Sequence, residues 1–387
     1  MFKYTCLNPI ARLGLDLMTD AFVETDKYEE ANAVLVRSAK MHDMELGEEL
    51  LAIARAGAGV NNIPVEECAK KGIVVFNTPG ANANAVKELV IAGMLLASRD
   101  IIGGVNWVDT QEGNENVGAA AEKQKKQYAG EEIYGKKLGV IGLGAIGARV
   151  ANAASGLGMK VLGYDPYISV DTAWNLSSTV EHIKDINEIF KNCDFITVHV
   201  PLTADTKNTI DDKAIELMKD GVVILNFSRD GLVNEDALLK GLENGKIKKY
   251  VTDFATPGVI GNEDTIVIPH LGASTKEAED NCAVMAVNQL VNYIENGNIK
   301  NSVNFPNCDL GVCEVAGRVG IFHKNITNMI GQFTAILAEA GINIEKMTNQ
   351  SKGDFAYTLI DTAATVTDDL KAKIAAVDGV IKVRVVK

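Results

Sequence analysis

Three glycines directly after an apolar run carry the clearest chemical signal in the sequence. They lie in Gly142-Leu-Gly144-Ala-Ile-Gly147, which has the pattern GxGxxG. In this pattern the first glycine permits a tight turn, the second lets the backbone approach a pyrophosphate, and the third lets a helix pack closely on the strand. The start of that helix offers N–H donors and positive dipole to phosphates. The pattern predicts a dinucleotide-binding turn that includes Ala145 and Ile146.

An acidic residue follows at a distance that suits the ribose of a dinucleotide. Asp165 comes directly after the apolar strand expected at 160–164, and it lies 18 residues after Gly147. A carboxylate there accepts hydrogen bonds from both ribose hydroxyls. It would repel the additional phosphate of NADP, and no arginine follows it in Asp165-Pro-Tyr-Ile. The predicted cofactor is therefore NAD.

Apolar strands alternate with helical segments on both sides of this motif. The strands after the motif recur at intervals of roughly 25–35 residues, which is typical of a doubly wound parallel sheet. The N-terminal residues show a similar alternation and predict a second parallel sheet. The expected strands are 137–141, 160–164, 195–199, 222–225, 249–253 and 265–268 in the later series, and 33–36, 50–54 and 73–76 in the earlier one.

Two long helices and a separate C-terminal segment complete the predicted organisation. The helices are expected at 84–99 and 275–296, and the polar stretch at 103–135 is expected to be a surface arm or a connection between domains. After residue 317 the apolar segments follow the order β-α-β-β-α-β, which is the ferredoxin-like order. We therefore expect an α/β fold with an additional α+β domain.

Composition and charge exclude several classes of protein. The 387 residues include 38 basic and 51 acidic side chains, and the net charge of −13 argues against a general nucleic-acid or anionic-membrane binder. No apolar run approaches the roughly 18–20 residues that a membrane helix needs, and the N-terminus lacks the apolar core of a signal peptide. We expect a cytoplasmic protein of two or three domains, at about 150 residues per domain.

The six cysteines do not form a pattern typical of zinc sites. No CxxC occurs, and none of the cysteines has a companion pair with a nearby histidine. Reduced, mostly buried thiols and no metal site are therefore expected. The cysteines are Cys6, Cys68, Cys193, Cys282, Cys308 and Cys313.

Four blocks of sequence follow one another in a recognisable order. They are Leu138–Gly147 with Asp165, His199-Val-Pro-Leu-Thr203 with Thr206, Asn226-Phe-Ser-Arg229-Asp-Gly-Leu-Val233, and Pro269-His270-Leu-Gly-Ala-Ser-Thr275. In content, order and spacing these blocks resemble those of the D-isomer-specific 2-hydroxyacid dehydrogenases, and the resemblance covers nearly the whole chain. It implies an NAD-dependent enzyme that interconverts a small 2-hydroxy acid and its 2-oxo acid.

The resemblance also implies an arrangement of domains. A doubly wound Rossmann domain for NAD at 99–279 would be inserted in a flavodoxin-like substrate domain formed by 1–98 and 280–305, with the active site in the cleft. The tail at 317–387 resembles an ACT regulatory domain. Members of the family are at least dimeric through the nucleotide domain, so a homodimer or homotetramer is expected.

The resemblance assigns the catalytic roles to Arg229 and His270, which both follow expected strands. Arg229 would bind the substrate carboxylate and polarise the carbonyl, since its fork suits bidentate pairing. His270 would exchange a proton with the substrate oxygen as hydride moves, because imidazole titrates near working pH. Without the family blocks, a surface ion pair and an ordinary loop histidine would be the simpler interpretations.

The same resemblance assigns the contacts to the cofactor. The segment His199-Val-Pro would pack the adenosine, and Asp253 would bind the nicotinamide carboxamide. The expected cofactor-binding residues are Gly142, Gly144, Ala145, Ile146, Gly147, Asp165, His199, Val200, Pro201, Thr206, Phe227, Ser228, Asp253, Gly272 and Ala273.

One departure from the family pattern concerns the partner of His270. The family places a glutamate a few residues after the position of Asp253, and that glutamate holds the catalytic histidine. The segment from Asp253 to Asp264 has no acid at this spacing, and Glu263 is the nearest glutamate. The carboxylate partner of His270 is therefore left open, and a non-catalytic NAD-sensing regulatory protein stays an alternative to an enzyme.

Two cations near the end of an early strand suit a substrate that carries both phosphate and carboxylate. Arg37 and Lys40 resemble the family's phosphate contacts. Gly57 and Gly59 would offer backbone N–H groups to the carboxylate, and Asn82 resembles a substrate-contacting asparagine. If the two cations are only solvated charges, the substrate would be another D-2-hydroxy acid.

Three residues of the tail match positions at which related ACT domains bind serine as a feedback inhibitor. They are His323, Asn325 and Asn343. The usual Pro-Gly of the intervening loop is replaced by Thr327-Asn328, so a domain that only mediates association is the alternative to a serine site.

Overall fold

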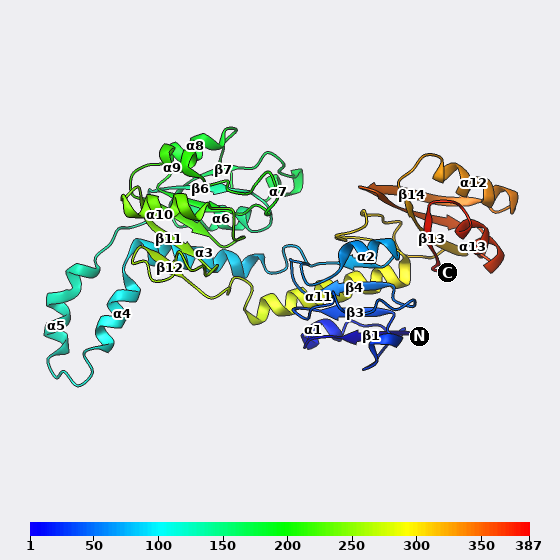
Figure 1. Ribbon diagram of the computed structural model, residues 1–387, viewed down its shortest axis with the longest axis horizontal. Helices are drawn as coiled ribbons and strands as arrows, with labels where there is room; N and C mark the ends of the chain where they lie inside the picture. The colour runs from blue at the N-terminus through cyan, green and yellow to red at the C-terminus, as the bar shows by residue number, and fades with distance from the viewer. The chain divides into compact units, whose positions relative to one another are not determined.

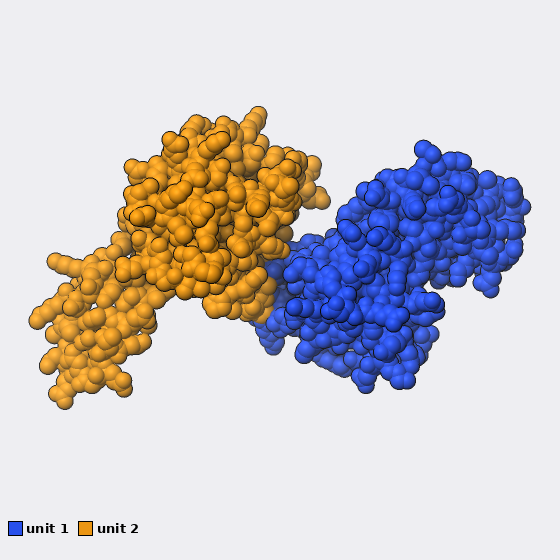
Figure 2. Space-filling view, in the orientation of Figure 1, with its two compact units in different colours: residues 1–82, 276–387 blue, residues 83–275 orange.

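The computed structural model describes all residues from 1 to 387, and they divide into two compact units. Unit 1 contains Met1–Asn82 and Lys276–Lys387, and unit 2 contains Ala83–Thr275 (Figure 2). Each unit has its own sheets and cores and is described by itself. None of the helices combines the length and apolar composition that crossing a membrane requires.

Unit 2 is built on a seven-stranded parallel sheet in the order β12-β11-β10-β9-β6-β7-β8. The chain begins at β6 in the middle of the sheet, runs to β8 at one edge, and then returns through β9 to the other edge. This is the doubly wound order, and it confirms the predicted Rossmann domain. The strands are β6 (Lys137–Ile141), β7 (Lys160–Tyr164), β8 (Glu181–His182), β9 (Phe195–Val198), β10 (Val222–Asn226), β11 (Ile247–Thr252) and β12 (Thr265–Val267).

Helices cover both faces of this sheet (Figure 1). One core contains apolar side chains of α8, α9 and α10, and the other contains those of α3 and α6. Strands β9 and β10 are buried along their whole length, and β6 is buried except at Lys137, as expected for strands that have helices on both sides. The helices are α3 (Ala83–Ser98), α6 (Gly147–Gly156), α7 (Val170–Trp174), α8 (Ile186–Asn192), α9 (Asp212–Leu217) and α10 (Glu235–Glu243).

The polar stretch at 103–135 contains two helices that the sequence did not reveal. They are α4 (Ile101–Asp109) and α5 (Val117–Gln124), and a 3₁₀ helix, η2, follows at Lys125–Tyr128. None of the residues in these three helices is buried. Figure 1 shows α4 and α5 side by side as an arm that extends from the sheet. Residues 111–127 show little apolar periodicity, whereas α4 carries apolar side chains at Ile101, Val105 and Val108 that are exposed.

The N-terminal part of unit 1 is a five-stranded parallel sheet in the order β2-β1-β3-β4-β5. This order is that of flavodoxin and confirms the second predicted sheet. The long helix α11 packs against α1 and β4 on one face. The elements are β1 (Phe2–Cys6), α1 (Arg12–Leu15), β2 (Phe22–Glu24), η1 (Tyr28–Glu30), β3 (Ala33–Val36), β4 (Ala52–Arg55), α2 (Val65–Lys70), β5 (Val74–Phe76) and α11 (Lys276–Asn296).

The C-terminal part of unit 1 is a four-stranded antiparallel sheet in the order β14-β15-β13-β16. Its elements follow one another as β-α-β-β-α-β, so the predicted ferredoxin-like order is confirmed. They are β13 (Gly317–Lys324), α12 (Met329–Glu339), β14 (Ile344–Lys352), β15 (Phe355–Thr362), α13 (Asp368–Ala375) and β16 (Val380–Val385).

The two faces of this small sheet belong to different cores. Val319, Ile321 and Ile360 pack with α12 and α13. On the other face, Phe322 and Tyr357 join the core that α11 forms with the N-terminal sheet. The C-terminal sheet is therefore covered on both sides and belongs to the same compact unit as the N-terminal sheet.

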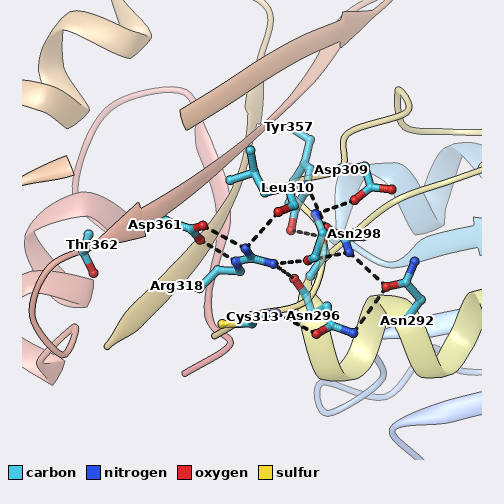
Figure 3. Close-up of polar contacts among 12 residues, drawn as sticks. Asn292, Asn296, Asn298, Asp309, Leu310, Cys313, Arg318, Tyr357, Asp361 and Thr362 are labelled. Atoms are coloured by element: carbon cyan, nitrogen blue, oxygen red, sulfur yellow. Dashed lines mark hydrogen bonds and ion pairs between the residues drawn. The ribbon is translucent and has the colours of Figure 1, made fainter. Parts of the chain in front are cut away.

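Two buried arginines, Arg318 and Arg384, fasten the C-terminal sheet to the end of α11, and Figure 3 shows the contacts of Arg318. Arg318 pairs with Asp361 and also donates to the carbonyl oxygens of Asn296, at 2.9 Å, and Gly311, at 2.7 Å. Arg384 donates to the carbonyl oxygen of Tyr293 at 2.7 Å and also to that of Ile294. The last carbonyl oxygens of a helix have no hydrogen-bond donor within the helix. In α11 the two guanidinium groups donate hydrogen bonds to these oxygens.

The units differ from the predicted domains at both boundaries of unit 2, which runs from 83 to 275 rather than from 99 to 279. The helix expected in the first domain, α3, lies in unit 2, where a side chain at Gly93 would come within 3.0 Å of Phe227 and Val251. The boundary therefore falls between 82 and 83 rather than between 98 and 99. The tail after 317 forms a sheet of its own, as predicted, and it belongs to unit 1 because this sheet shares a core and buried hydrogen bonds with α11.

All six cysteines are free, and Cys68, Cys193, Cys282 and Cys308 are buried. Burial raises the pKa of Cys68 and of Cys193 to about 12, so these thiols stay protonated at neutral pH. No three His, Cys, Asp or Glu side chains are grouped in a way that could hold a metal ion.

Candidate active site

The glycine turn lies between β6 and α6 and leaves its middle residue open. Gly142 has φ of +88°, and a side chain there would come within 2.6 Å of the His199 carbonyl oxygen. A side chain at Gly147 would come within 1.9 Å of the Gly142 carbonyl oxygen, so the helix can start close to the strand only with glycine. A side chain at Gly144 would have no protein atom within 4 Å of its first carbon. The open side of Gly144, at the start of α6, is where a pyrophosphate can approach the backbone.

Asp165 is held at the end of β7 by two backbone groups. Its Oδ2 accepts from the N–H of Leu143 in the glycine turn, and its Oδ1 accepts from the N–H of Tyr167, both at 2.8 Å. A carboxylate has about four acceptor positions, so each oxygen keeps capacity for a ribose hydroxyl. The residues of the turn and Asp165 therefore fit NAD.

His199 follows β9 and is uncharged at neutral pH. Its Nε2 lies 2.9 Å from the Thr197 hydroxyl, and its buried Nδ1 has no partner. Burial lowers the pKa of His199 to about 3, which excludes it as a proton donor at neutral pH. The loop after Val200 is fixed by Thr206, whose hydroxyl donates to the Pro201 carbonyl at 2.5 Å. This segment suits the packing of an uncharged group, which is the role that the family resemblance implies for it with adenosine.

The turn after β10 presents the guanidinium of Arg229. Asn226 donates to the Arg229 carbonyl at 3.0 Å, and the hydroxyl of Ser228 donates to the Val198 carbonyl at 2.6 Å. Phe227 is buried against α3. Nη1 of Arg229 donates to the Ser228 carbonyl at 2.6 Å, while the residue is exposed and forms no ion pair. The backbone is fixed and the rest of the fork is available to bind a carboxylate.

Asp253 and His270 follow the neighbouring strands β11 and β12. Asp253 is 2% exposed, and its Oδ2 accepts from the N–H of Gly272 at 3.1 Å. Burial raises the pKa of Asp253, while the hydrogen bond from Gly272 and the charges of His270 and Arg229 oppose this shift. The ring of Phe254 packs edge-on against His270 with centroids 5.0 Å apart. The structure therefore brings Arg229, Asp253 and His270 together at the carboxyl ends of three adjacent strands.

The segment that follows β12 completes this edge of unit 2. Gly272 is buried beside Asp253, and a side chain at this position would come within 3.1 Å of Asp253 Oδ2. Ala273 follows it and is half-buried. Glu263, the glutamate nearest in sequence to Asp253, precedes β12 and lies at the opposite end of that strand from His270.

The substrate residues expected in unit 1 follow the carboxyl ends of β3, β4 and β5. Arg37 forms an exposed ion pair with Glu279 of α11, at 2.8 Å, and its backbone N–H donates to Asn8. Lys40 is exposed and forms no ion pair. Gly57 accepts from the N–H of Thr78 at 3.1 Å through its carbonyl. Asn82 is the last residue before the boundary of the two units and is half-buried.

Sequence reasoning missed Arg55, which ends β4 beside Arg37. Its Nε donates to the Arg37 carbonyl at 2.8 Å, and a side chain at Gly59 would come within 2.7 Å of its Nη1. Gly59 therefore leaves the space that the guanidinium of Arg55 occupies. The strand order could have indicated Arg55, because β3 and β4 are adjacent parallel strands and the residues after their carboxyl ends lie at the same edge of the sheet.

The three residues expected to bind an effector differ in accessibility. His323 is 2% exposed, with Nδ1 2.8 Å from the Lys324 carbonyl oxygen and Nε2 2.9 Å from the Thr358 hydroxyl. Asn325 is exposed and donates to the Gly353 carbonyl at 3.1 Å. The side chain of Asn343 is exposed. The buried position of His323 suits a structural role in the sheet, whereas the two asparagines are accessible.

Known proteins match this sequence and fold. Residues 91–272 match the family model described as D-isomer specific 2-hydroxyacid dehydrogenase, NAD binding domain. D-3-phosphoglycerate dehydrogenase of Methanocaldococcus jannaschii is 38% identical over 291 residues, which make up 73% of this chain and 53% of that protein. Hydroxypyruvate reductase of Thermotoga maritima is 37% identical over 273 residues, which make up 67% of this chain and 84% of that protein.

A solved structure agrees with these matches. NAD+-bound 3-phosphoglycerate dehydrogenase of Entamoeba histolytica has a TM-score of 0.61 and 30% identity, and the match covers 78% of this chain and 98% of that chain. The chain spans about half the length of the M. jannaschii relative. With 84% of the T. maritima relative covered at 37% identity, the chain belongs to the D-isomer specific 2-hydroxyacid dehydrogenase family, and NAD is its cofactor.

Proposed function

We propose that the protein is an NAD-dependent D-3-phosphoglycerate dehydrogenase, which oxidises D-3-phosphoglycerate to 3-phosphooxypyruvate at the first step of serine biosynthesis. The observation that carries the proposal is the group formed by Arg229, Asp253 and His270 beside the dinucleotide turn. The M. jannaschii and E. histolytica relatives, which bear this enzyme's name, support the choice of substrate.

In the proposed reaction the substrate loses a hydride from C2 and a proton from the hydroxyl on C2. When NAD is bound, its nicotinamide ring would be the acceptor of this hydride. Arg229 binds the substrate carboxylate with the part of its fork that Ser228 does not use, and this fixes C2. His270 takes the hydroxyl proton on a ring nitrogen as the carbonyl forms. In the reverse direction the same group returns the proton to the carbonyl oxygen.

The phosphate of the substrate is assigned to cations of unit 1. Arg37, Lys40 and Arg55 provide three positive charges at the ends of β3 and β4. Backbone N–H groups near Gly57 and Gly59 are assigned to the carboxylate, and Asn82 to a further substrate contact. The pair between Arg37 and Glu279 is exposed and exchangeable, so a phosphate can replace the glutamate.

Two alternatives remain from the sequence. The first is a dehydrogenase for another D-2-hydroxy acid, and it draws support from the T. maritima relative, which is named hydroxypyruvate reductase. The second is an NAD-sensing regulatory protein with the same fold. The departure from the family pattern after Asp253 favours it, and the retained Arg229 and His270 argue against it.

One assay separates the three functions. The appearance of NADH is followed with D-3-phosphoglycerate, D-glycerate and D-lactate, on wild type and on His270→Ala. Turnover that is restricted to the phosphorylated acid and reduced at least 100-fold in His270→Ala supports the proposal. Equal turnover with glycerate or lactate supports the other dehydrogenase, and no turnover with any acid supports the regulator.

We assign a regulatory role to the C-terminal sheet and its two helices, which resemble an ACT domain. Asn325, which follows β13, and Asn343, which precedes β14, are the accessible residues for serine, while the buried His323 supports β13. A homodimer or homotetramer is proposed from the family. Calorimetric titration with serine tests the first assignment, with Asn343→Ala as the control, and light scattering measures the second.

A further inference from the structure

The loop that carries the two proposed phosphate cations is held by side chains that no step of the proposed reaction uses. This loop, residues 37–41, follows β3 and contains Arg37 and Lys40. Asn8 lies in the segment after β1, and Asn62 lies between β4 and α2. Because β1, β3 and β4 are neighbouring parallel strands, the residues after their carboxyl ends lie at the same edge of the sheet.

Asn8 binds three consecutive backbone donors of the loop. Its Oδ1 accepts from the N–H groups of Arg37, at 2.9 Å, Ser38, at 3.1 Å, and Ala39, at 3.0 Å. Successive N–H groups that point to one place form a concavity suited to an anion, and here the amide oxygen of Asn8 occupies it. An amide oxygen has two lone pairs, so these three donors use its whole capacity. A bound phosphate therefore has the side chains of the loop available to it rather than these backbone groups.

The carbonyl oxygens of the same loop are held by a second group of donors. Nδ2 of Asn62 donates to the carbonyl of Ala39 at 2.7 Å and to that of Arg37 at 3.3 Å. Nε of Arg55 donates to the Arg37 carbonyl at 2.8 Å. Asn62 is 8% exposed, and its own carbonyl accepts from the N–H of Met41 at 2.9 Å. The backbone of the loop is therefore fixed by hydrogen bonds, although the loop contains no regular secondary structure.

The fixed backbone determines where the two cationic side chains begin. Arg37 forms one exchangeable contact, the exposed ion pair with Glu279, and Lys40 forms no ion pair. Long cationic side chains lose conformational freedom when they bind a ligand, and a loop that is already ordered reduces the freedom that binding removes. The readiness of Arg37 and Lys40 for an anion therefore depends on the two asparagines that hold their backbone.

From this geometry we infer that Asn8 is a positioning residue for the phosphate of the substrate, and that it acts through the loop that carries Arg37 and Lys40. The inference rests on the proposed function, because it concerns the phosphate of that substrate. Without the oxygen of Asn8, three neighbouring N–H groups lose their acceptor and the loop gains conformational freedom. The two cations must then be ordered when the phosphate binds, so the affinity for the phosphorylated acid falls. Hydride and proton transfer beside Arg229 and His270 is not affected.

The test compares the steady-state kinetics of Asn8→Ala, Asn8→Asp and Asn32→Ala. We expect Asn8→Ala to raise the KM for D-3-phosphoglycerate about 5- to 20-fold, while kcat, the KM for NAD and the KM for D-glycerate stay at their wild-type values. Asn8→Asp should return the first KM to within about threefold of wild type, because a carboxylate oxygen accepts the same three N–H groups and their dipoles offset its charge.

Asn32→Ala is the matched control for a general loss of stability. The Oδ1 of Asn32 also accepts a backbone N–H, that of Lys3 at 2.9 Å, but Asn32 precedes β3 and lies at the opposite end of this strand from the loop. Asn32→Ala should therefore leave the KM for D-3-phosphoglycerate unchanged. Thermal unfolding of both alanine variants shows how far each substitution destabilises the fold.

Two kinetic results would overturn the inference: equal KM values for D-3-phosphoglycerate in Asn8→Ala and Asn32→Ala, or an equal rise in Asn8→Ala and Asn8→Asp. Amide hydrogen exchange needs no substrate and tests the loop itself. The N–H groups of residues 37–39 should exchange faster in Asn8→Ala but not in Asn8→Asp, and unchanged exchange in Asn8→Ala also counts against Asn8. Failure of the proposed function is separable, because wild type would then show no preference for D-3-phosphoglycerate over D-glycerate.

Discussion

Arg318 and Asp361 form a doubly hydrogen-bonded ion pair in which both side chains are only 1% exposed. The arginine lies on β13 and the aspartate on β15, which are adjacent strands of the C-terminal sheet. The same guanidinium reaches the carbonyl of Asn296 at the end of α11. The guanidinium of Arg318, whose charge Asp361 neutralises, therefore also caps the C-terminal end of α11.

We expect Arg318→Met to destabilise unit 1 strongly. The substitution leaves the carboxylate of Asp361 and two carbonyl oxygens buried without their donor. Removing one partner of a buried pair costs about 3–5 kcal/mol. Urea unfolding of wild type and of Arg318→Met measures the difference in the free energy of unfolding. Lys373→Met serves as the control, because its pair with Asp369 is exposed and should contribute nothing measurable. Equal midpoints for Arg318→Met and the control would contradict the prediction.

The sequence predicted the two parallel sheets and the tail because burial leaves a periodic signal. Strands such as Lys137–Ile141 and Lys160–Tyr164 are apolar runs bounded by turns, and the predicted limits agree with the observed ones. Strand β1 was missed because the segment FKYTC alternates poorly and is only partly buried. Arg318 and Arg384 gave no signal, since arginine is seldom fully buried and their partners are far away in sequence.

The residues of the candidate site that could be predicted are those that follow a strand and belong to one of the four family sequence blocks. The turn at Gly142 and the positions of Arg229 and His270 are of this kind. The relation between Asp253 and His270 was not predictable, because it depends on the pairing of β11 with β12 and on a hydrogen bond to Gly272. Arg55 was missed for a similar reason, since its contact with Arg37 joins two strands.

Stability should fall at mildly acidic pH because of His199. Burial lowers the pKa of His199 in the folded state to about 3, whereas the unfolded chain protonates near 6.5. The unfolded state therefore binds more protons between these values, so this contribution is fully present above pH 6.5 and is lost as the pH falls towards 3. Between pH 7 and pH 5 the loss amounts to about 2 kcal/mol. Urea unfolding without cofactor measures it, and His199→Gln should show a smaller decrease over the same interval.

Two glycines of the NAD turn should respond differently to substitution. At Gly144 an added side chain meets no protein atom, whereas at Gly147 it meets the Gly142 carbonyl oxygen. Gly144→Val should therefore keep its unfolding midpoint and lose at least 10-fold in NADH affinity, because it blocks the approach of the pyrophosphate. Gly147→Ala should lower the midpoint itself. Fluorescence titration with NADH and thermal unfolding separate the effects, and unchanged NADH affinity in Gly144→Val would contradict the proposed site.

Removing Glu279 should strengthen the binding of a phosphorylated substrate. The carboxylate of Glu279 pairs with Arg37 at 2.8 Å, and the two side chains are 44% and 38% exposed. Such pairs contribute up to about 1 kcal/mol, so a phosphate that displaces the glutamate gains up to about fivefold when the glutamate is absent. We expect Glu279→Gln to lower the KM for D-3-phosphoglycerate about twofold to fivefold without a change in kcat. Glu277→Gln removes the same charge from the same turn of α11, but the residue is exposed and pairs with no arginine. Equal KM values for the two variants would mean that Arg37 does not bind the phosphate.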